Sequence, residues 1–408
     1  MSTLSISHYF PFSQMVVTRQ SVSEDATMAV VVLKPDQRFH PVCHACRTPG
    51  HGVHSEETRP VRDLDFAAAR VTLNCTYRKL FCQACGRVMV EDTGVFEPWS
   101  RVTRRLARFV HDLCKVMTVT DVAGHLGLDW KTVKNIDKAF LEKEYATPDY
   151  DGLHILAVDE ISVRKGRRYM TVVLNYETGA VVWMGEKNEK ATLLKFYALL
   201  APAQRESIKA VAMDMWKGFI EATKEALPNA AIVFDLFHVV SSFGKVIDQV
   251  RIAEFNKAQA RNRPVFKGAK YLLLKNRRNL RKRSQRAQLN ELLALNRAIN
   301  IVYILKDKLK HIWSYTSRTW AAKALREWIA LARTLRNHAV NKFCRTLKDH
   351  AYGILNHCDF AIHTSVLEGV NNKIKVIKRK AFGFHDLDYF ALKVMQAFDP
   401  KNVQLFRR

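Results

Sequence analysis

The sequence predicts an α/β protein whose sheet is interrupted by a long helical insertion and preceded by two small N-terminal domains. Three observations lead to this fold class. Short apolar runs alternate with helical runs over residues 153–240, which is the pattern of an α/β domain. Two Cys-x-x-Cys pairs lie upstream of it, and residues 241–355 are almost wholly helical in pattern and very basic.

The charge of the chain indicates a polyanionic partner. Its 408 residues include 65 Lys and Arg against 39 Asp and Glu, a formal net charge of +26. This excess favours nucleic acid, with a soluble protein that is merely basic as the alternative. The N-terminus lacks the pattern of a targeting signal, and no run approaches the roughly 18 apolar residues of a spanning helix. We therefore expect a cytoplasmic protein with no membrane partner, in which cysteines are metal ligands or buried thiols.

Residues 1–38 stay unassigned apart from a predicted strand over residues 29–33. Residues 39–95 contain two cysteine pairs, each with a two-residue spacing: Cys43, Cys46, Cys82 and Cys85. Two such pairs complete a tetrahedral four-thiolate site for Zn²⁺. Gly86 follows the second pair, where the turn needs a residue that tolerates positive φ. We predict a zinc-ribbon domain, and the alternative is four buried free cysteines.

Other side chains near the two pairs could replace one cysteine as a zinc ligand. These alternatives are His44, His51, His54 and Cys75. A closed four-thiolate site leaves no open coordination position, so its role should be structural. We expect it to help present basic residues such as Arg47 and Arg78 to DNA.

Residues 100–148 predict a helix-turn-helix domain. Thr118 or Thr120 can cap the first helix, Ala123 is small where the helices cross, and Gly127 gives the turn a permissive backbone. The second helix would expose residues suited to phosphates and base edges. These residues are Trp130, Lys131, Thr132, Lys134 and Asn135. A plain helical hairpin is the alternative.

The α/β region begins with three hairpin strands, LHILAVDE, RRYMTVVLN and AVVWMGE. A helix, the strand IKAVAMDMW, a second helix and the strand AAIVFDLFHVV follow. This is the order of a ribonuclease-H-like core, in which the first and fourth strands lie side by side. We assign residues 153–240 and 356–398 to that core, and residues 241–355 to a basic helical insertion.

The first and fourth strands end at Asp159 and Asp214, so their carboxylates should be neighbours. Like charges this close repel unless a cation lies between them, and oxygen ligands favour Mg²⁺ or Mn²⁺. Two such ions about 4 Å apart can activate a water or a 3′-hydroxyl and stabilise the leaving oxygen of a phosphodiester. Each aspartate alone could instead cap a turn. Glu160 should point to the opposite side of the strand, with a supporting role.

A helix predicted over residues 364–380 offers a third carboxylate, Glu368. One helical face is apolar: Val366, Val370, Ile374 and Ile377. The other face is polar: Glu368, Asn372, Lys375 and Arg379. Glu368 therefore lies away from the apolar face, although a metal ligand must approach the sheet. Asp359, Asp386 and Asp388 are rivals for its role.

The insertion contains the segment KNRRNLRKRSQR, residues 275–286, with seven basic residues in twelve. As a helix it would be positive nearly all round. We expect it to bind phosphate, for which Arg277, Arg278 and Arg281 are candidates, and the alternative is a solvated helix. Three tryptophans at helical spacing are expected in the core rather than stacked on DNA: Trp313, Trp320 and Trp328.

Four stretches resemble the transposases of the ISL-three group of insertion sequences: LAVDE, AVAMDMW, VFDLFHVV and LEGVNNKIKVIKRKAFGF. The resemblance covers about residues 40–395. It implies a DDE triad, formed by Asp159, Asp214 and Glu368, and a helical insertion between the fifth strand and Glu368. Asp235 and His238 match a recurrent motif of the group.

The resemblance implies a DNA transposase that binds the terminal inverted repeats of an insertion sequence and catalyses metal-dependent strand cleavage and transfer into target DNA. At least a homodimer on DNA is implied, since two ends must be joined. One alternative is a transposase-derived DNA-binding protein without catalysis, against which the intact acidic triad argues. A structure-specific nuclease of the same fold is the other, and the helix-turn-helix argues against it.

Overall fold

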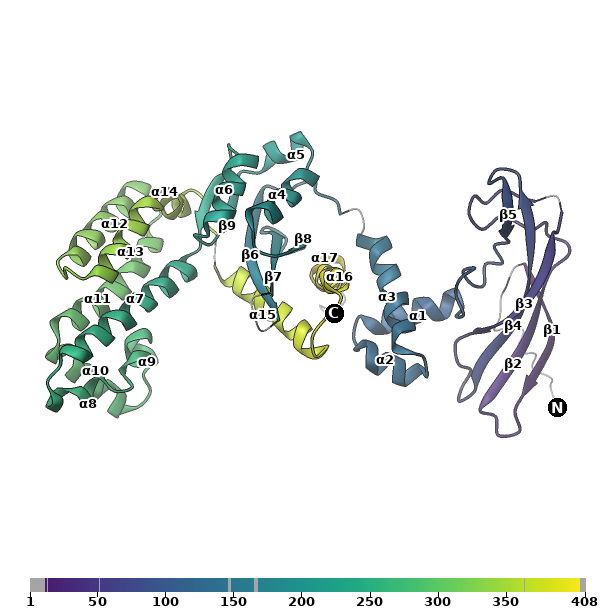
Figure 1. The fold of residues 1–408 in the computed structure, drawn as a ribbon, viewed down its shortest axis with the longest axis horizontal. Coiled ribbons are helices and arrows are strands. Elements are labelled where there is room, and N and C mark those ends of the chain that lie inside the picture. The colour runs from purple at the N-terminus through teal and green to yellow at the C-terminus, as the bar shows by residue number, and fades with distance from the viewer. Residues whose placement is uncertain are drawn as a thin grey trace. The chain divides into compact units, whose positions relative to one another are not determined.

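The computed structural model describes residues 12, 14–50, 52–145, 148–164, 168–362 and 364–403. One of the alternative zinc ligands, His51, lies outside these residues. The chain divides into two compact units, residues 1–144 and residues 145–408. Each unit contains one five-stranded sheet together with helices, as Figure 1 shows, so the predicted α/β class is confirmed.

The sheet of the first unit has the order β1-β2-β4-β3, with β5 paired to β4. Its strands are β1 (Met15–Val22), β2 (Met28–Pro35), β3 (Ser55–Arg62), β4 (Arg70–Cys82) and β5 (Arg87–Val90). The strand predicted over residues 29–33 lies within β2, which runs parallel to β4. Residues that the sequence left unassigned thus supply two strands of the sheet that leads into the second cysteine pair.

Three helices complete the first unit: α1 (Arg104–Cys114), α2 (Val119–Leu126) and α3 (Trp130–Tyr145). They enclose a small apolar core, in which Val110, Val122 and Val133 are fully buried. Nδ1 of His111 lies 2.8 Å from Oδ1 of Asp137, and both side chains are buried. Because a buried carboxylate needs a polar partner, this contact fixes α3 against α1.

The sheet of the second unit has the order β10-β9-β6-β7-β8. Its strands are β6 (Ile155–Arg164), β7 (Arg168–Asn175), β8 (Val181–Glu186), β9 (Ala210–Met213) and β10 (Ala231–Phe234). The first three strands are antiparallel, whereas β9 is parallel to both β6 and β10. The prediction that the first and fourth strands of this region are neighbours is therefore confirmed, since these are β6 and β9.

Helices cover both faces of this sheet. Alternate residues of β6 serve different faces: Leu156 packs in the core formed with α4 (Lys190–Leu199) and α6 (Lys217–Ala226), and Ala157 in the core formed with α15 (Thr364–Lys380) and α16 (Leu387–Phe398). The short helices α5 (Pro202–Ser207) and α17 (Pro400–Val403) complete the elements around the sheet. Helix α15 has the bounds predicted for the helix that carries Glu368.

The insertion between β10 and α15 is helical, and its core is continuous with the α4–α6 face of the sheet (Figure 1). Its helices are α7 (Leu236–Lys257), α8 (Arg263–Phe266), α9 (Ala269–Leu274), α10 (Arg283–Leu295), α11 (Arg297–His311), α12 (Arg318–Arg333), α13 (His338–Asp349) and α14 (Ala351–Leu355). None of the helices in the described part of the chain is long and apolar enough to span a bilayer.

The three tryptophans of the insertion have different environments. Trp328 is buried and donates a hydrogen bond to the carbonyl of Leu305, and the half-buried Trp313 stacks on His357, so both predictions of a core role are confirmed. The prediction for Trp320 is wrong. Its ring is 58% exposed, because it lies on the solvent-facing side of α12.

Candidate active site and metal centre

Four cysteines converge where β4 and β5 meet in the first unit. Their sulfur atoms all lie within 4.8 Å of one another. The Sγ atoms of Cys43 and Cys85 are 3.9 Å apart, and those of Cys46 and Cys82 are 3.4 Å apart. A tetrahedral zinc ion with Zn–S bonds of about 2.3 Å would place its sulfurs about 3.8 Å apart. The donor set and its spacing are thus compatible with structural zinc.

Each cysteine pair sits on a tight turn that ends in a left-handed residue. The N–H of Arg47 donates to the carbonyl of Cys43 at 2.9 Å, and the N–H of Gly86 donates to that of Cys82 at 2.8 Å. The φ angles of Arg47 and Gly86 are 63° and 66°. Glycine adopts this conformation without steric cost, whereas arginine does not. The backbone conformation of Arg47 therefore needs stabilising contacts from residues outside the first cysteine turn.

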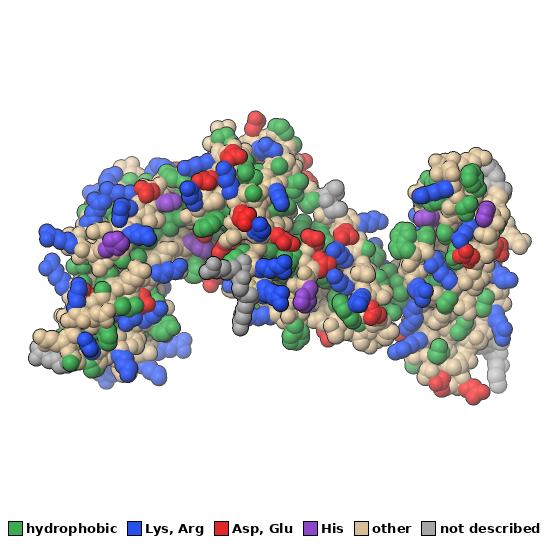
Figure 2. Space-filling view, in the orientation of Figure 1, with side chains coloured by type: hydrophobic (Ala, Val, Ile, Leu, Met, Phe, Trp, Pro, Cys, Tyr) green, Lys and Arg blue, Asp and Glu red, His purple; other side chains and the backbone are tan. Residues whose placement is uncertain are grey.

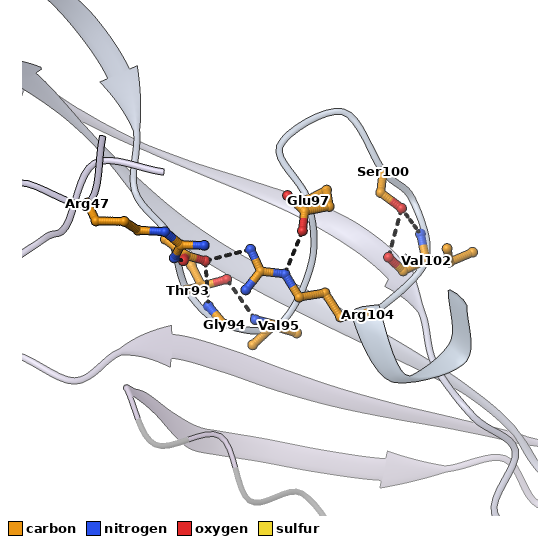
Figure 3. A network of polar contacts seen from close by, with 9 residues as sticks. Arg47, Thr93, Gly94, Val95, Glu97, Ser100, Val102 and Arg104 are labelled. Atoms are coloured by element: carbon orange, nitrogen blue, oxygen red, sulfur yellow. Dashed lines mark hydrogen bonds and ion pairs between the residues drawn. The ribbon is translucent and has the colours of Figure 1, made fainter. Parts of the chain in front are cut away.

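Asp92 supplies that support and joins the first cysteine turn to the start of helix α1 (Figure 3). Its carboxylate forms ion pairs with Arg47 and with Arg104, the first residue of α1. Arg104 also donates from Nε to Glu97 at 2.8 Å. A change at the cysteine cluster would therefore be transmitted to the helical part of the same unit.

Two of the alternative zinc ligands, His44 and Cys75, have other environments. Nδ1 of His44 lies 3.2 Å from the carbonyl oxygen of Val90, and Cys75 is fully buried in the core of the sheet, where burial raises its pKa to about 12. His54 lies 3.4 Å from the hydroxyl of Ser55. His51 lies outside the described residues. The paired cysteines remain the ligand set that the geometry favours.

Arg78 is not available to DNA, contrary to expectation. Its side chain is buried and donates from Nε to the carboxylate of Glu91 at 2.8 Å. A buried guanidinium needs such a partner, so Arg78 stabilises the sheet. Arg47 is more exposed, although its guanidinium is paired with Asp92.

The turn between α2 and α3 is built from residues whose local roles the sequence indicates. Thr118 caps α2 in a capping box with Asp121, and Gly127 ends the helix at a φ of 61°. Oδ1 of Asp129 accepts the N–H of Lys131 at 2.9 Å and so starts α3. These caps fix where α3 begins, and hence which of its residues face solvent.

The predicted DNA-contacting residues lie in the first turns of α3. Trp130 is 52% exposed, and Nζ of Lys131 lies 5.8 Å from the centre of its ring. Thr132 and Asn135 are exposed and Lys134 is half-buried. The start of α3 therefore presents basic, amide and hydroxyl groups together, the side chains used for phosphates and base edges.

In the second unit, three aspartates lie level with one another on adjacent strands. Asp214 and Asp235 directly follow β9 and β10, but the prediction that the first strand ends at Asp159 is wrong, because β6 continues to Arg164 in its pairing with β7. The parallel registers of β6 with β9 and of β9 with β10, continued past the last paired residues, align Asp159, Asp214 and Asp235. All three point to the face covered by α15, because they alternate with residues that pack in the opposite core. We call these residues the aspartate row.

Burial and mutual repulsion act on the aspartate row. Desolvation is the main cause that raises the pKa of Asp214 and of Asp235, and the charge of Asp159 raises both further. Glu368 also raises the pKa of Asp235, while His238 opposes both shifts. Within the described residues, neither Asp159 nor Asp214 forms an ion pair with a lysine or arginine side chain. A divalent cation could balance this charge.

Helix α15 is attached to β6 at two points. Nδ2 of Asn371 donates to Oδ2 of Asp159 at 2.5 Å, and Nζ of Lys378 donates to the carbonyl of Ser162 at 2.8 Å. Glu368 lies three residues before Asn371, on the same side of the helix. The structure thus brings the helix turn that carries Glu368 against the aspartate row.

The packing of α15 also explains how Glu368 can approach the sheet, although the sequence placed it away from the apolar face. The buried side chains are Leu367, Val370 and Ile374, whereas Val366 is only half-buried. The apolar face is therefore rotated toward Glu368 by comparison with the predicted face. Asn371 was missed for the same reason, although its spacing of four residues from Leu367 is a signal that could have placed it beside the sheet.

The rival acids are used elsewhere. Asp359 pairs with Arg318 at 2.8 Å, Asp386 caps α16, and Asp388 lies exposed in the first turn of that helix. The oxygens of the predicted triad do not form a group within 4.8 Å of one another, since in the described ranges only the four cysteines do so. Convergence on one ion would require side-chain movement.

The basic segment of the insertion is not one helix. Residues 277–279 form a short 3₁₀ turn, and α10 begins only at Arg283. Leu280 interrupts the basic run and is fully buried. Nζ of the buried Lys306 donates to the carbonyls of Leu273 and Lys275, and burial lowers the pKa of Lys306 to about 8. These contacts anchor the segment as a loop.

The predicted phosphate-binding residues of the second unit are exposed. They are Arg277, Arg278 and Arg281 in the basic loop, and Lys375 and Arg379 on α15. Figure 2 shows Lys and Arg side chains spread over the helices of the insertion, at the left of that view. The loop therefore presents its charge to solvent, although its backbone is held by buried contacts.

Comparison with known proteins decides the family. Residues 156–394 match a protein family described as transposase, and residues 91–141 match the helix-turn-helix domain of transposase family ISL3. The chain belongs to the ISL3 family of transposases. It is 39% identical over 372 residues to the transposase for insertion sequence element IS1001 of Bordetella parapertussis, covering 90% of this chain and 91% of that protein. It is 28% identical over 354 residues to the transposase for IS1557 of Mycobacterium tuberculosis, covering 80% and 78% respectively.

The matched regions of this ISL3 transposase contain the aspartate row and the helix-turn-helix. The longer match contains the aspartate row and Glu368, and the shorter match contains α1, α2 and most of α3. A helix-turn-helix domain implies that the protein binds DNA. The four cysteines precede both matched regions, so the zinc interpretation depends on their own geometry.

Proposed function

We propose that this protein is a cut-and-paste DDE transposase that cleaves DNA at the ends of its insertion sequence and joins the freed 3′ ends to target DNA. The observation that carries the proposal is the alignment of Asp159 with Asp214, together with the hydrogen bond from Asn371 that holds the Glu368 helix against Asp159. The strand order of the second sheet supports a ribonuclease-H-like core over residues 153–240 and 356–398.

Asp159, Asp214 and Glu368 would hold Mg²⁺ or Mn²⁺ at the sheet edge. The fit follows from Asp159, which is buried, and Asp214, which is half-buried, neither of which forms an ion pair with a lysine or arginine among the residues that the structure describes. When bound, such ions activate a water or 3′-hydroxyl and stabilise the leaving oxygen. The chain itself orients the ligands: Asn371 fixes one oxygen of Asp159, and the N–H of Trp216 fixes one oxygen of Asp214 at 3.0 Å. The other oxygen of Asp159 also accepts the N–H of Glu160 at 2.7 Å, so a cation would bind Asp159 through lone pairs that these hydrogen bonds leave open.

The first unit would recognise the terminal inverted repeats. The exposed groups at the start of α3 suit the major groove, and a structural zinc ion in a ribbon over residues 39–95 would stabilise the same unit. The helix-turn-helix would extend over residues 100–148, and the insertion over residues 241–355 would add phosphate contacts. Two ends must be joined, so a homodimer or larger assembly on DNA is part of the proposal.

A supercoiled plasmid that carries the element between its inverted repeats tests this function. With Mg²⁺, the full-length protein is expected to release the element with free 3′-hydroxyls, and Asp159→Ala is expected to remove this activity while DNA binding remains. Cleavage that survives Asp159→Ala would refute the assignment. Binding without cleavage by the unaltered protein would support a DNA-binding protein with an inactive core. Equal cleavage of a scrambled repeat would support a structure-specific nuclease.

The basic loop gives a second test, based on salt dependence. Each phosphate neutralised on duplex DNA contributes about 0.9 to the slope of log affinity against log salt. Replacing Arg277, Arg278 and Arg281 by glutamine is expected to reduce that slope by up to about 2.7. Lys257→Gln is a matched control, because this exposed lysine is paired with Glu254. An unchanged slope in the triple variant would show that the loop is merely solvated.

A further inference from the structure

Two exposed aromatic residues closely follow members of the aspartate row in the chain. Trp216 is 48% exposed and Phe237 is 56% exposed. Trp216 lies two residues after Asp214, and Phe237 lies two residues after Asp235. Because β9 and β10 are adjacent strands, the two turns that carry these rings leave the sheet about 4.8 Å apart.

The same hydrogen bond shapes both turns. The N–H of Trp216 donates to Oδ1 of Asp214 at 3.0 Å, and the N–H of Phe237 donates to Oδ1 of Asp235 at 2.7 Å. Each carboxylate therefore holds the backbone of the aromatic residue that follows it. Single exposed apolar residues are common on protein surfaces, but here one arrangement is repeated at two neighbouring strand ends.

Trp216 is held in a defined orientation despite its exposure. Its Nε1 donates to the carbonyl of Asn188 at 3.0 Å. A Cβ atom at Gly218 would lie 2.9 Å from Nε1, so the glycine leaves the space that the indole occupies. The ring of Phe237 packs edge-on against His238, with centroids 5.7 Å apart. Rings fixed in this way lose little conformational freedom when they bind a ligand.

We propose that Trp216 and Phe237 form a stacking site for unpaired nucleobases of the DNA at the point of strand cleavage. The proposal rests on the proposed function, and it adds a ligand to the same site. Paired bases are stacked within the duplex, so an enzyme that needs access at a strand end gains from unpairing it. Aromatic rings stack on every base and so hold unpaired ends without selecting a sequence.

The surroundings favour a base over an apolar protein partner. The rings border carboxylates that are proposed to act on phosphodiesters, and the chain carries a net charge of +26. Lys217 follows Trp216 directly. Its Nζ lies 3.5 Å from Glu221, but its side chain is 86% exposed, so it can exchange this surface partner for the phosphate next to a stacked base. A hydrophobic partner would be poorly matched to this mixture of charge and isolated rings.

A binding experiment tests the proposal without any need for catalysis. The full-length protein is titrated, in buffer without magnesium or manganese, with the labelled terminal repeat as a blunt duplex or with about three unpaired bases at its cleavage end. The unaltered protein is expected to prefer the unpaired end by roughly tenfold. Trp216→Ala combined with Phe237→Ala should lose this preference and bind the blunt duplex as before. Trp216→Phe, which keeps a ring, should retain most of it.

Trp320→Ala is the matched control, because Trp320 is exposed to a similar degree but lies on α12 rather than directly after the aspartate row. It should leave the preference unchanged. An undiminished preference in the double alanine variant would overturn the proposal. So would a change in oligomeric state without a change in preference, because the rings would then serve contacts between copies of the chain.

Cleavage in Mg²⁺ gives the second readout. The double alanine variant is expected to cut a fully paired end about tenfold more slowly, and an end with mismatched terminal bases at nearly the normal rate, since the cost of unpairing is already met. Equal slowing on both ends would mean that the rings only shape the site, and the proposal would fail. If the unaltered protein cuts neither end but still prefers unpaired bases, the proposed function fails and the stacking site stands.

Discussion

Asp214→Asn is expected to abolish strand cleavage in Mg²⁺, with a loss of about a thousandfold or more, while binding to the terminal repeat is kept. The loss follows because a neutral amide cannot balance divalent cations, and these contribute several kcal/mol to phosphodiester cleavage. The substitution preserves the shape of the side chain, and its remaining oxygen can still accept the N–H of Trp216. Cleavage of a plasmid that carries both repeats measures the effect.

The same substitution is expected to stabilise the metal-free protein. Burial and the charge of Asp159 raise the pKa of Asp214 in the folded state. An acid whose pKa is raised on folding favours the unfolded state once the pH exceeds its unfolded value of about 3.9. Stability without metal should therefore fall as the pH rises through the raised pKa, and Mg²⁺ should restore it. Asp214→Asn should remove this pH-dependent loss and raise the melting midpoint by on the order of 2 °C.

Asp388→Asn is the control for both effects, since this acid is exposed in the first turn of α16. It should cleave at the normal rate and keep the stabilisation by Mg²⁺. Melting curves at pH 5 and pH 8, with and without Mg²⁺, separate the two variants. If Asp388→Asn abolished cleavage and Asp214→Asn did not, the assignment of the metal site would be wrong.

Cys82→Ser is expected to have the largest effect on stability in the first unit. Structural zinc contributes an apparent binding free energy of about 10–16 kcal/mol at pH 7, and a serine hydroxyl is a poor substitute for thiolate. Bound zinc should fall from about one ion per chain to near zero. Because Asp92 links the cysteine turn to α1, affinity for the repeat should fall by at least about tenfold as well.

Cys75→Ala separates loss of zinc from loss of packing, because Cys75 lies on the same strand but in the apolar core. It should cost about 1 kcal/mol of stability through the small cavity and retain its zinc. Elemental analysis of the purified full-length variants provides the measurement. A Cys82→Ser protein that keeps a full equivalent of zinc would show that the ligand set is different.

The fold could be predicted where the apolar pattern is dense. The first half of β6 and all of β9 are apolar, so both strands and the acids that follow these apolar runs are visible in the sequence. Strand β1 was missed because it is an edge strand with a single buried residue, Met15, and an edge strand exposed on both faces has no alternating pattern. In the basic segment, the seven basic residues concealed Leu280, whose burial breaks the expected helix.

The site could be predicted in part for a similar reason. The parallel register of β6 and β9 aligns Asp159 with Asp214, and both acids follow apolar runs that the sequence shows. The role of Asn371 depends on which face of α15 packs on the sheet. A rotation of the helix by one residue changes which side chains belong to that face. Exposure of Trp216 could not be read from a sequence either, because an apolar side chain is normally expected inside.

Because the insertion is long, the ribosome synthesises Glu368 well after Asp159 and Asp214. Helix α15 follows the DNA-binding unit by roughly 220 residues, which the ribosome adds in about 10–45 s. During that interval a nascent chain can expose a folded helix-turn-helix while Glu368 and Asn371 have not yet been synthesised. Translation that stops early would therefore leave a product able to occupy the repeats without cutting them. Such a fragment would act as a competitive inhibitor of the full-length protein.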